Sequence, residues 1–286
     1  EAHPAELATG AWALAKLSWG SPGTLGGISQ QSATSIRDFS ELDLAKLAWA
    51  FGKLGLDDRR VLAAIAEEAV AKAAHLKPQE LCNIAWSFAT LVVHHEDLCH
   101  ATADEAVKKL RSFNPQDISN LAWSFAVVGA QDPRLFRELS AVARLRMRKF
   151  TPQNIANLAW AHAKLDIRDA ELFRACASDA LSKLQEFSPQ ALSNIVWAFA
   201  KSGAVGTDLF AACSRQAVLL HGKFAPQALS NLAWSAAKLA IADRHLFHFI
   251  SREVVDAADA FNAQGLSNLA WAYATLDLAD ERVIGS

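Results

Sequence analysis

A set of polar and aromatic residues recurs along the chain at a fixed interval, and residues of these types can contact a nucleic acid. Eight of the nine tryptophans are spaced 37 residues apart, from Trp12 to Trp271. With this Trp taken as position 0, Gln recurs at position −7, Asn at −3 and Lys at +4. Amides can bond base edges, lysines can bind phosphates, and an aromatic ring can stack on a base. The members are Asn83, Asn120, Asn157, Asn194, Asn231 and Asn268, with Lys16, Lys53, Lys164, Lys201 and Lys238.

A residue that is the same in every copy cannot distinguish one base from another. We therefore interpret the Trp mainly as a wedge between consecutive helices, and the Asn mainly as a hydrogen-bonding residue between repeats, with RNA contact as the alternative for both. Sequence reading would need positions that vary among copies, which are −6, +1 and +4. Glu80 and Asp117 could instead be acids of a helix start. The candidates at −6 are Asp43, Glu80, Asp117 and Asn154.

A basic cluster adds a second candidate surface. Arg144, Arg146, Arg148 and Lys149 follow one another within six residues and could hold phosphates. The alternative is a solvated helix face, because the alternation of Arg with apolar residues cannot place every Arg on one side of a helix.

Catalytic and metal-binding patterns are weak. His94, His95, Cys99 and His100 lie close together, but their spacing matches no standard closed zinc site. Cys176 and Cys213 share one repeat position among apolar residues and are interpreted as core residues. The sequence has no Gly-rich phosphate loop and no G-x-S-x-G motif. We therefore expect no enzyme activity, no metal, no cofactor and no small-molecule substrate.

Composition limits the classes of protein that remain. The 286 residues are 52% hydrophobic and 20% charged, which excludes a disordered chain. The net charge of −2 means that any nucleic-acid binding must come from a local surface. The four cysteines form no CxxC pair and are expected to be reduced thiols in a protein that is not secreted. The absence of a long uncharged apolar run predicts no membrane span.

The elements that carry the recurring residues are predicted to be helical hairpins. Residues suited to an N-cap precede a Pro or Ala/Leu-rich segment that ends near Gly55, Gly129 or Gly203. A second apolar-periodic helix is predicted in each repeat, and in five of the eight copies a capping Asp precedes it. We therefore predict an all-α fold, a right-handed α–α superhelix (α-solenoid) of 37-residue repeats. The first caps are Ser40, Asn114, Thr151, Ser188 and Asn262, and the second caps are Asp58, Asp132, Asp169, Asp243 and Asp280.

The predicted organisation is a single array over residues 1–286. Residues 1–38 form a degenerate N-terminal repeat, residues 39–260 form six regular repeats, and residues 261–286 form a truncated last repeat. Residues 21–35 contain three glycines and a polar tail, so the second helix of the first repeat is expected to be poor or absent. Since the last copy stops within its unit, we expect the chain to be a fragment of a longer one.

The repeat unit Phe-x-Pro-Gln-x-Leu-x-Asn-Leu-Ala-Trp-Ala-Phe-Ala-Lys-Leu resembles the heptatricopeptide repeats of apicomplexan and related organellar proteins. It is also similar to the octotricopeptide repeats of algal chloroplast proteins, although their Pro-Pro-Pro-Glu-Trp ending is missing here. The resemblance covers essentially the whole chain. It implies an α-solenoid that binds organellar transcripts or ribosomal RNA in a mitochondrion or plastid, often with a C-terminal nuclease-like RAP domain. Neither that domain nor a transit peptide is present in this sequence.

The sequence thus predicts an RNA-binding solenoid that recognises single-stranded mRNA or rRNA through the concave surface of its first helices. Its expected role is to support transcript or rRNA processing, stability or translation. The alternative is a protein–protein interaction scaffold of the helical-repeat type. Lysines in register favour RNA, whereas the near-neutral net charge favours the scaffold.

Overall fold

The computed structural model describes residues 2–204 and 206–278 of the chain, and all regular structure in them is helical. The prediction of an all-α solenoid of repeats is confirmed. The chain divides into two compact units, residues 1–142 and residues 143–286. No helix in the described part of the chain is long and apolar enough to cross a membrane.

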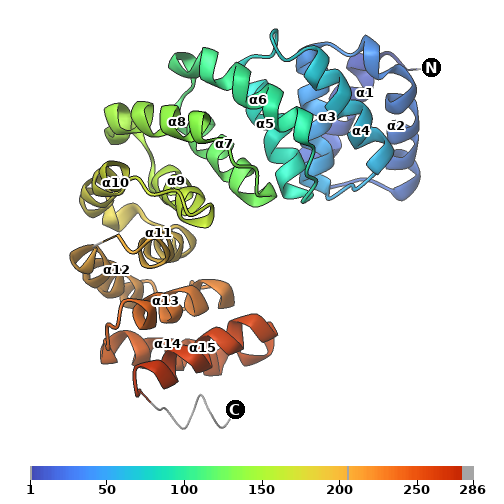
Figure 1. Ribbon diagram of the computed structural model, residues 1–286. Coiled ribbons are helices and arrows are strands. Elements are labelled where there is room, and N and C mark those ends of the chain that lie inside the picture. The colour runs from blue at the N-terminus through green and yellow to red at the C-terminus, as the bar shows by residue number, and fades with distance from the viewer. Residues whose placement is uncertain (1, 205, 279–286) are drawn as a thin grey trace. The chain divides into compact units, whose positions relative to one another are not determined.

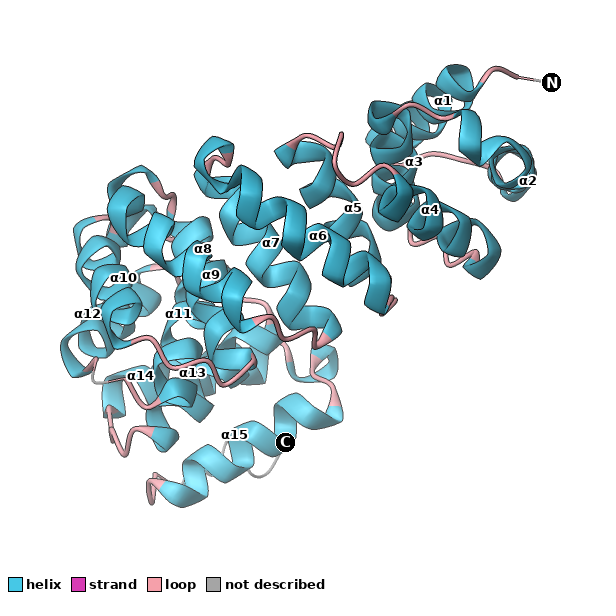
Figure 2. Cartoon of the chain, turned by 45° about the horizontal axis from the view of Figure 1, so that its top comes forward, coloured by secondary structure: helices cyan, strands magenta, loops and turns pink. Residues whose placement is uncertain are grey.

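In the first unit, the helices that carry the tryptophans lie side by side, and the second helices of the hairpins lie beside them (Figure 1, Figure 2). We call the Trp-bearing helices the first helices. They are α1 (Pro4–Lys16), α3 (Glu41–Leu54), α5 (Pro78–Thr90) and α7 (Pro115–Val128). The second helices are α2 (Pro22–Ser35), α4 (Arg59–Ala71) and α6 (Glu96–Lys109), and the 3-10 turns are η1 (Ile36–Asp38) and η2 (Leu110–Ser112).

The second unit repeats this arrangement, and α8 (Pro133–Arg146) spans the division between the units. Its first helices are α9 (Pro152–Lys164), α11 (Pro189–Ser202), α13 (Pro226–Lys238) and α15 (Ala263–Thr275). Its second helices are α10 (Ala170–Ser182), α12 (Thr207–Leu219) and α14 (Arg244–Asp256), with 3-10 turns η3 (Met147–Lys149), η4 (Leu184–Glu186) and η5 (Ala258–Ala260).

Helix starts follow the predicted caps. The Thr151 hydroxyl accepts a hydrogen bond from the Asn154 amide at 3.3 Å, and the Asn114 side chain accepts one from the Asp117 amide at 2.9 Å. Such bonds satisfy amides that have no partner inside the helix. The same type of bond confirms the caps Ser40, Ser188 and Asn262, and the second-helix caps Asp58, Asp132, Asp169 and Asp243. Asp280 lies outside the described residues.

Every first helix ends with a residue of positive φ at position +6. Gly55, Gly129 and Gly203 occupy this position, with φ between 68° and 73°, and confirm the predicted helix ends. The other five repeats place a residue with a side chain in the same left-handed conformation, which is costly for any residue except Gly. They are Ser18, Val92, Asp166, Ala240 and Asp277.

The first helices approach one another closely because small residues stand at positions −4 and +3. A Cβ atom added to Gly52 would lie 2.9 Å from Cα of Ser87 on the next first helix. The Ser230 hydroxyl donates to the Gly265 carbonyl at 3.2 Å, and the Cys82 thiol donates to the Asp117 carbonyl at 3.4 Å. In both hydrogen bonds, position −4 of one repeat contacts the backbone at position −6 of the next.

In three repeats, a lysine at position +23 of the second helix donates hydrogen bonds to backbone carbonyls of the segment just before the first helix of the same repeat. Lys109 Nζ donates to the carbonyls of Ala73, Ala74 and Leu76 at 2.8–3.2 Å, and it pairs with Glu105 at 3.0 Å. Lys72 and Lys183 make equivalent bonds, with Glu68 and Asp179 as the paired acids. This role of the lysines at +23 was not predicted from the sequence.

The second helix of the first repeat was predicted to be poor or absent, and this was wrong. Residues Pro22–Ser35 form α2, with Ser21 as the cap and Pro22 in the first turn. A Cβ atom at Gly23, Gly26 or Gly27 would meet nothing within 4 Å, so these glycines are not forced by close contacts. The helix packs against α1 and α4, and Ser29 hydrogen-bonds Asp58. Tertiary contacts thus outweigh the low helix propensity.

The strained helix end at Val92 provides a test of this geometry. Val92 has φ of 54°, and its side chain is 71% exposed, so replacing it removes strain and little packing. We expect Val92→Gly to raise the free energy of unfolding by about 1 kcal/mol, measured from urea denaturation midpoints. Gly129→Val at the same repeat position should lower it. Destabilisation by Val92→Gly would contradict the assigned left-handed conformation.

The hydrogen bonds and the ion pair of Lys183 provide a second test, of their contribution to stability. In Lys183→Met the carbonyls of Arg148 and Phe150 lose a charged donor and Asp179 loses its ion-pair partner. We expect a loss of about 2 kcal/mol in the free energy of unfolding. Lys223→Met, at an exposed site, is the matched control and should change the stability little. Equal effects of the two substitutions would show that these contacts of Lys183 do not stabilise the fold.

Candidate nucleic-acid interface

The recurring tryptophans form ladders along the first helices. Ring centroids lie 6.5 Å apart for Trp49 and Trp86, with an angle of 25° between the planes. In the second unit, Trp160, Trp197, Trp234 and Trp271 follow one another at 6.1–6.4 Å. Each inner ring is half-buried between its neighbours. The rings therefore lie as wedges between consecutive first helices.

The ladder of the first unit begins with a lysine between two rings. Lys16 Nζ lies 5.4 Å from the ring centroid of Trp12 and 5.1 Å from that of Trp49. A cation at this distance from two aromatic faces is attracted by both. Lys16 is thus held by the ladder, unlike the lysines at the same position in other repeats.

The asparagines at position −3 leave most of their side-chain hydrogen-bonding capacity unused. All six are half-buried beside the tryptophans. Asn157 and Asn268 accept a hydrogen bond from the Gln four residues earlier, at 2.8 Å and 3.3 Å. Among the described residues, no side-chain amide of the six bonds a neighbouring repeat, so the interpretation of Asn as a link between repeats was wrong. Their amide groups remain available to a ligand.

The lysines at position +4 lie on the same stripe. Lys53, Lys164, Lys201 and Lys238 are exposed, and Lys201 pairs with Asp166 of the preceding repeat at 2.9 Å. Steps of 4, 3 and 4 residues join positions −7, −3, 0 and +4, which places them along one face of each first helix. Every Gln at −7 is also exposed. Thr90, Val127 and Thr275 replace the Lys in three repeats.

The candidates at position −6 do not belong to this face. The Glu80 carboxylate accepts from the Lys77 amide at 2.8 Å, and Asp117 accepts from the Asn114 amide at 2.9 Å. Asn154 accepts from the Thr151 amide at 3.1 Å, and Asp43 accepts from the Ser40 hydroxyl at 2.6 Å. All but Asp43 are buried, and burial raises the pKa of Asp117. These side chains serve as helix-start residues, which is the alternative role expected for Glu80 and Asp117.

Position +1 is excluded for a similar reason. Ser87, Ser124 and Ser235 are buried and donate to the backbone carbonyl of the Asn at −3, at 2.6–2.7 Å. Of the three variable positions, only +4 presents side chains that a ligand can reach.

The basic cluster is not a single surface. Arg144 forms an ion pair with Glu171, and Arg146 is half-buried. Arg148 and Lys149 are exposed on η3. The predicted phosphate site therefore reduces to Arg148 and Lys149.

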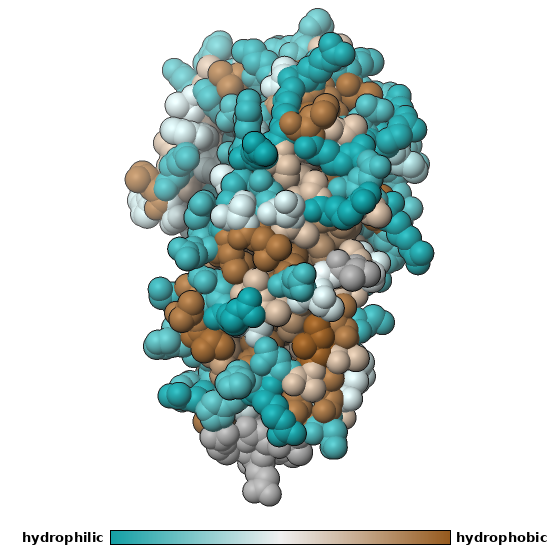
Figure 3. Space-filling model, turned by 90° about the vertical axis from the view of Figure 1, so that its left-hand side faces the viewer, coloured by the Kyte–Doolittle hydropathy of each residue, from teal (hydrophilic) through white to brown (hydrophobic). Residues whose placement is uncertain are grey.

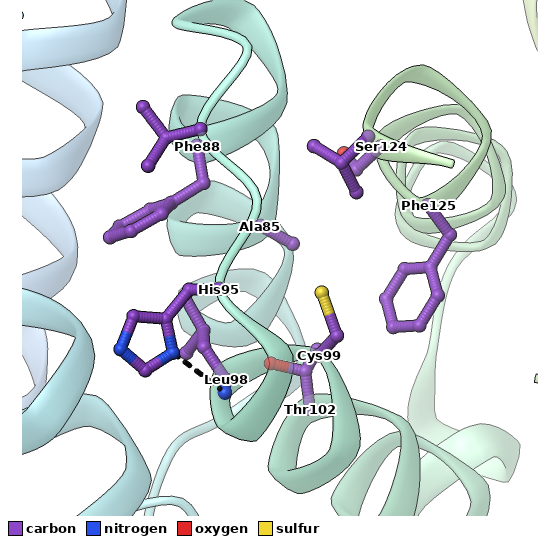
Figure 4. Close-up of a pocket in the computed structure, with 10 residues that line it drawn as sticks. Ala85, Phe88, His95, Leu98, Cys99, Thr102, Ser124 and Phe125 are labelled. Carbon is purple, nitrogen blue, oxygen red and sulfur yellow. Dashed lines mark hydrogen bonds between the residues drawn. The ribbon is translucent and has the colours of Figure 1, made fainter. Parts of the chain in front are cut away.

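The remaining reactive side chains lie in packed surroundings. Cys99 points into a cavity of about 20 Å³ between α5, α6 and α7, and His95 beside it caps α6 by accepting from the Leu98 amide at 3.3 Å (Figure 4). Burial raises the pKa of Cys99, and it raises the pKa of Cys213 to about 12. The described residues contain no cluster of three or more His, Cys, Asp or Glu that could hold a metal ion.

His162 is a buried titratable group in the core. It stands at position +2, where Phe51, Phe88, Phe125 and Phe199 stand in other repeats. Its Nδ1 donates to the Leu158 carbonyl at 2.8 Å. Burial lowers the pKa of His162 below its usual 6.5, so the ring is neutral in the folded protein.

This pKa shift predicts a pH dependence of stability. Below pH 6.5 the unfolded chain binds a proton at His162 more readily than the folded chain does, so stability falls as the pH decreases, until the folded pKa is reached. The loss is about 1.4 kcal/mol for each pH unit in this window. His162→Phe should reduce the difference between urea midpoints measured at pH 7.5 and pH 5. An unchanged difference would show that His162 does not titrate as described.

A comparison with protein families matches residues 6–218 of the 286 to the family described as RNA-editing substrate-binding complex 6 protein. The match covers more than half of the chain, from α1 through most of α12. A search of the curated proteins found no match.

Proposed function

Because the chain belongs to the family of the RNA-editing substrate-binding complex 6 protein, we propose that it binds single-stranded RNA along the stripe of its first helices. The family description names the substrate of RNA editing, which is RNA. The observation that carries the proposal is the repeated set of an exposed Gln, a half-buried Asn and an exposed Lys beside each inner Trp of the second unit. These groups bond RNA through its bases, 2′-hydroxyls and phosphates.

The Trp ladders set the spacing of the contacts. Successive rings lie 6.1–6.5 Å apart, so equivalent groups recur at a short and regular step along the stripe. A regular step of this kind suits a strand that presents one phosphate and one base per repeat. We expect each repeat to contact one nucleotide on the concave side of the first helices.

The proposed contacts favour binding that depends little on the RNA sequence. Gln at −7 and Asn at −3 are the same in six repeats, and the side chains at −6 and +1 face the protein. Position +4 varies only among Lys, Thr and Val, and a Lys bound to phosphate carries no sequence information. Any base preference of the amides would be the same in each repeat, so it would favour a run of one base.

The biological setting follows from the same proposal. We expect the RNA to be an organellar mRNA or rRNA, in a mitochondrion or plastid, with the protein supporting its processing, stability or translation. Most of the thiols are buried, and carboxylates such as that of Asp117 cap helices, so these groups favour a role in binding without catalysis by this chain. A scaffold that binds proteins through the same stripe is the competing function, and RNA-binding measurements distinguish the two.

RNA binding can be measured by fluorescence anisotropy with a labelled single-stranded RNA of random sequence at several salt concentrations. The test variant is Lys164, Lys201 and Lys238 changed together to Ala. We expect weaker binding and a salt slope reduced by about 2, because each phosphate contact on a single strand contributes about 0.7 to the slope. Comparison of homopolymers should give similar affinities, or a preference for one base throughout.

The matched control changes three exposed basic residues outside the stripe to Ala, Lys108, Arg215 and Lys223. It changes the net charge equally and should leave the salt slope nearly unchanged. Equal losses in both variants would mean that binding depends on net charge alone. Failure to bind any RNA at low salt would overturn the proposed function.

A further inference from the structure

The second unit exposes a row of apolar side chains on its second helices. Leu145 is 86% exposed, Leu181 41%, Leu219 74% and Val255 45%, and Val218 beside Leu219 is 38% exposed. They stand at positions +21 and +22, at the C-terminal ends of α8, α10, α12 and α14. Apolar patches interrupt the hydrophilic surface on the side of the molecule seen in Figure 3. We call these five residues the apolar row.

The apolar row is a feature of the second unit and not of the repeat. At the same positions the first unit has Val70 and Val107, which are half-buried, and Ala71 and Lys108. Neighbouring second helices pack through other residues, because α10 contacts α12, and α12 contacts α14, without covering the row. Apolar side chains exposed in register, one repeat after another, are typical of an interaction surface.

The charges beside the row change sign from one end to the other. Position +25 is Arg148, Gln185, Gly222 and Asp259 in the four successive repeats. The cationic end also carries Lys149. Arg148 and Asp259 are exposed, and in the part of the chain that the structure describes neither side chain forms an ion pair. At position +25 the charge is therefore positive at one end of the row and negative at the other, and the exposed Glu186 and Lys223 lie beside the two middle positions.

We propose that a second copy of this chain docks on the apolar row, antiparallel to it, about a two-fold axis through the middle of the row. In this arrangement Leu145 meets Val255 of the second copy, and the residues at Leu181 and Val218 face one another across the axis. Arg148 of each copy meets Asp259 of the other. The contact is isologous, since the same patch serves on both copies.

The charge pattern favours this occupant over others. A surface whose charges reverse along its length is complementary to its own reversed copy, whereas a parallel copy would set Arg148 against Arg148. RNA and anionic membranes are both repelled by the end that carries Asp256 and Asp259. Because the row lies on the second helices, the dimer leaves the stripe of the first helices open. Each dimer would then present two stripes.

Sedimentation velocity of the chain from about 1 to 100 μM measures the association, in the range where small interfaces dissociate. We expect a monomer–dimer equilibrium. Leu219→Glu places a charge in the middle of the row and should weaken the dimer by at least about 10-fold. Leu17→Glu changes an exposed leucine of the first unit, 73% exposed, and should leave the association unchanged. A monomer at every concentration, or a dimer unaffected by Leu219→Glu, overturns the proposal.

Charge reversal tests the antiparallel arrangement. Arg148→Glu places two like-charge pairs in the dimer, and so does Asp259→Arg, so each variant alone should be largely monomeric. In a mixture of the two variants, Glu at 148 faces Arg at 259, and Asp at 259 faces Arg at 148, so dimers should form again. The double variant Arg148→Glu with Asp259→Arg should also dimerise. Without recovery in the mixture, the two-fold arrangement is wrong.

Discussion

The close approach of successive first helices is the constraint on which the rest of the structure depends. Gly52 has no space for a Cβ atom against the backbone at Ser87, and the hydroxyl of Ser230 reaches the Gly265 carbonyl. At this separation a large side chain does not fit between the first helices at the contact, and it fits only on the face of the helices beside the contact. The indole rings occupy that face with their centroids 6.1–6.5 Å apart, so the ladder is a consequence of small residues that lie beneath it.

The same constraint determines which side chains a ligand can reach. Position −6 lies against position −4 of the preceding repeat, so Glu80 and Asp117 are buried and turn their carboxylates to the helix start. Position +1 is buried, and its serines bond the backbone of the same helix. Only −7, −3 and +4 remain on the outer face, and two of these hardly vary. Uniform contacts suit binding that depends on the RNA backbone more than on its sequence.

The period of 37 residues was sufficient to predict the helices, the caps and the wedge role of the tryptophans, because these depend on residues close together in sequence. The role of position −6 could not be decided in this way, since an acid at Glu80 can either face a ligand or cap a helix, and burial by the preceding repeat decides between them. Helix α2 was missed because its stability comes from α1, α4 and the bond of Ser29 to Asp58. The role of Lys109 left a signal in the sequence, which is the recurrence of Lys at +23 with an acid four residues earlier. Because cations near helix C-termini are common, this signal alone does not indicate a contact with the backbone.

First and second helices are under different packing constraints. This difference explains which positions can vary from one repeat to the next. A change on a first helix such as α11 disturbs the ladder on both sides, since the ring of Trp197 contacts those of Trp160 and Trp234. The C-terminal ends of the second helices are separated by looser contacts, so Leu145, Ser182, Leu219 and Asp256 can differ at one repeat position without disturbing the core. Selection of a partner can therefore act on the second helices while the first helices keep a uniform surface. A chain built this way separates the recognition of a common polymer from the recognition of a particular protein surface.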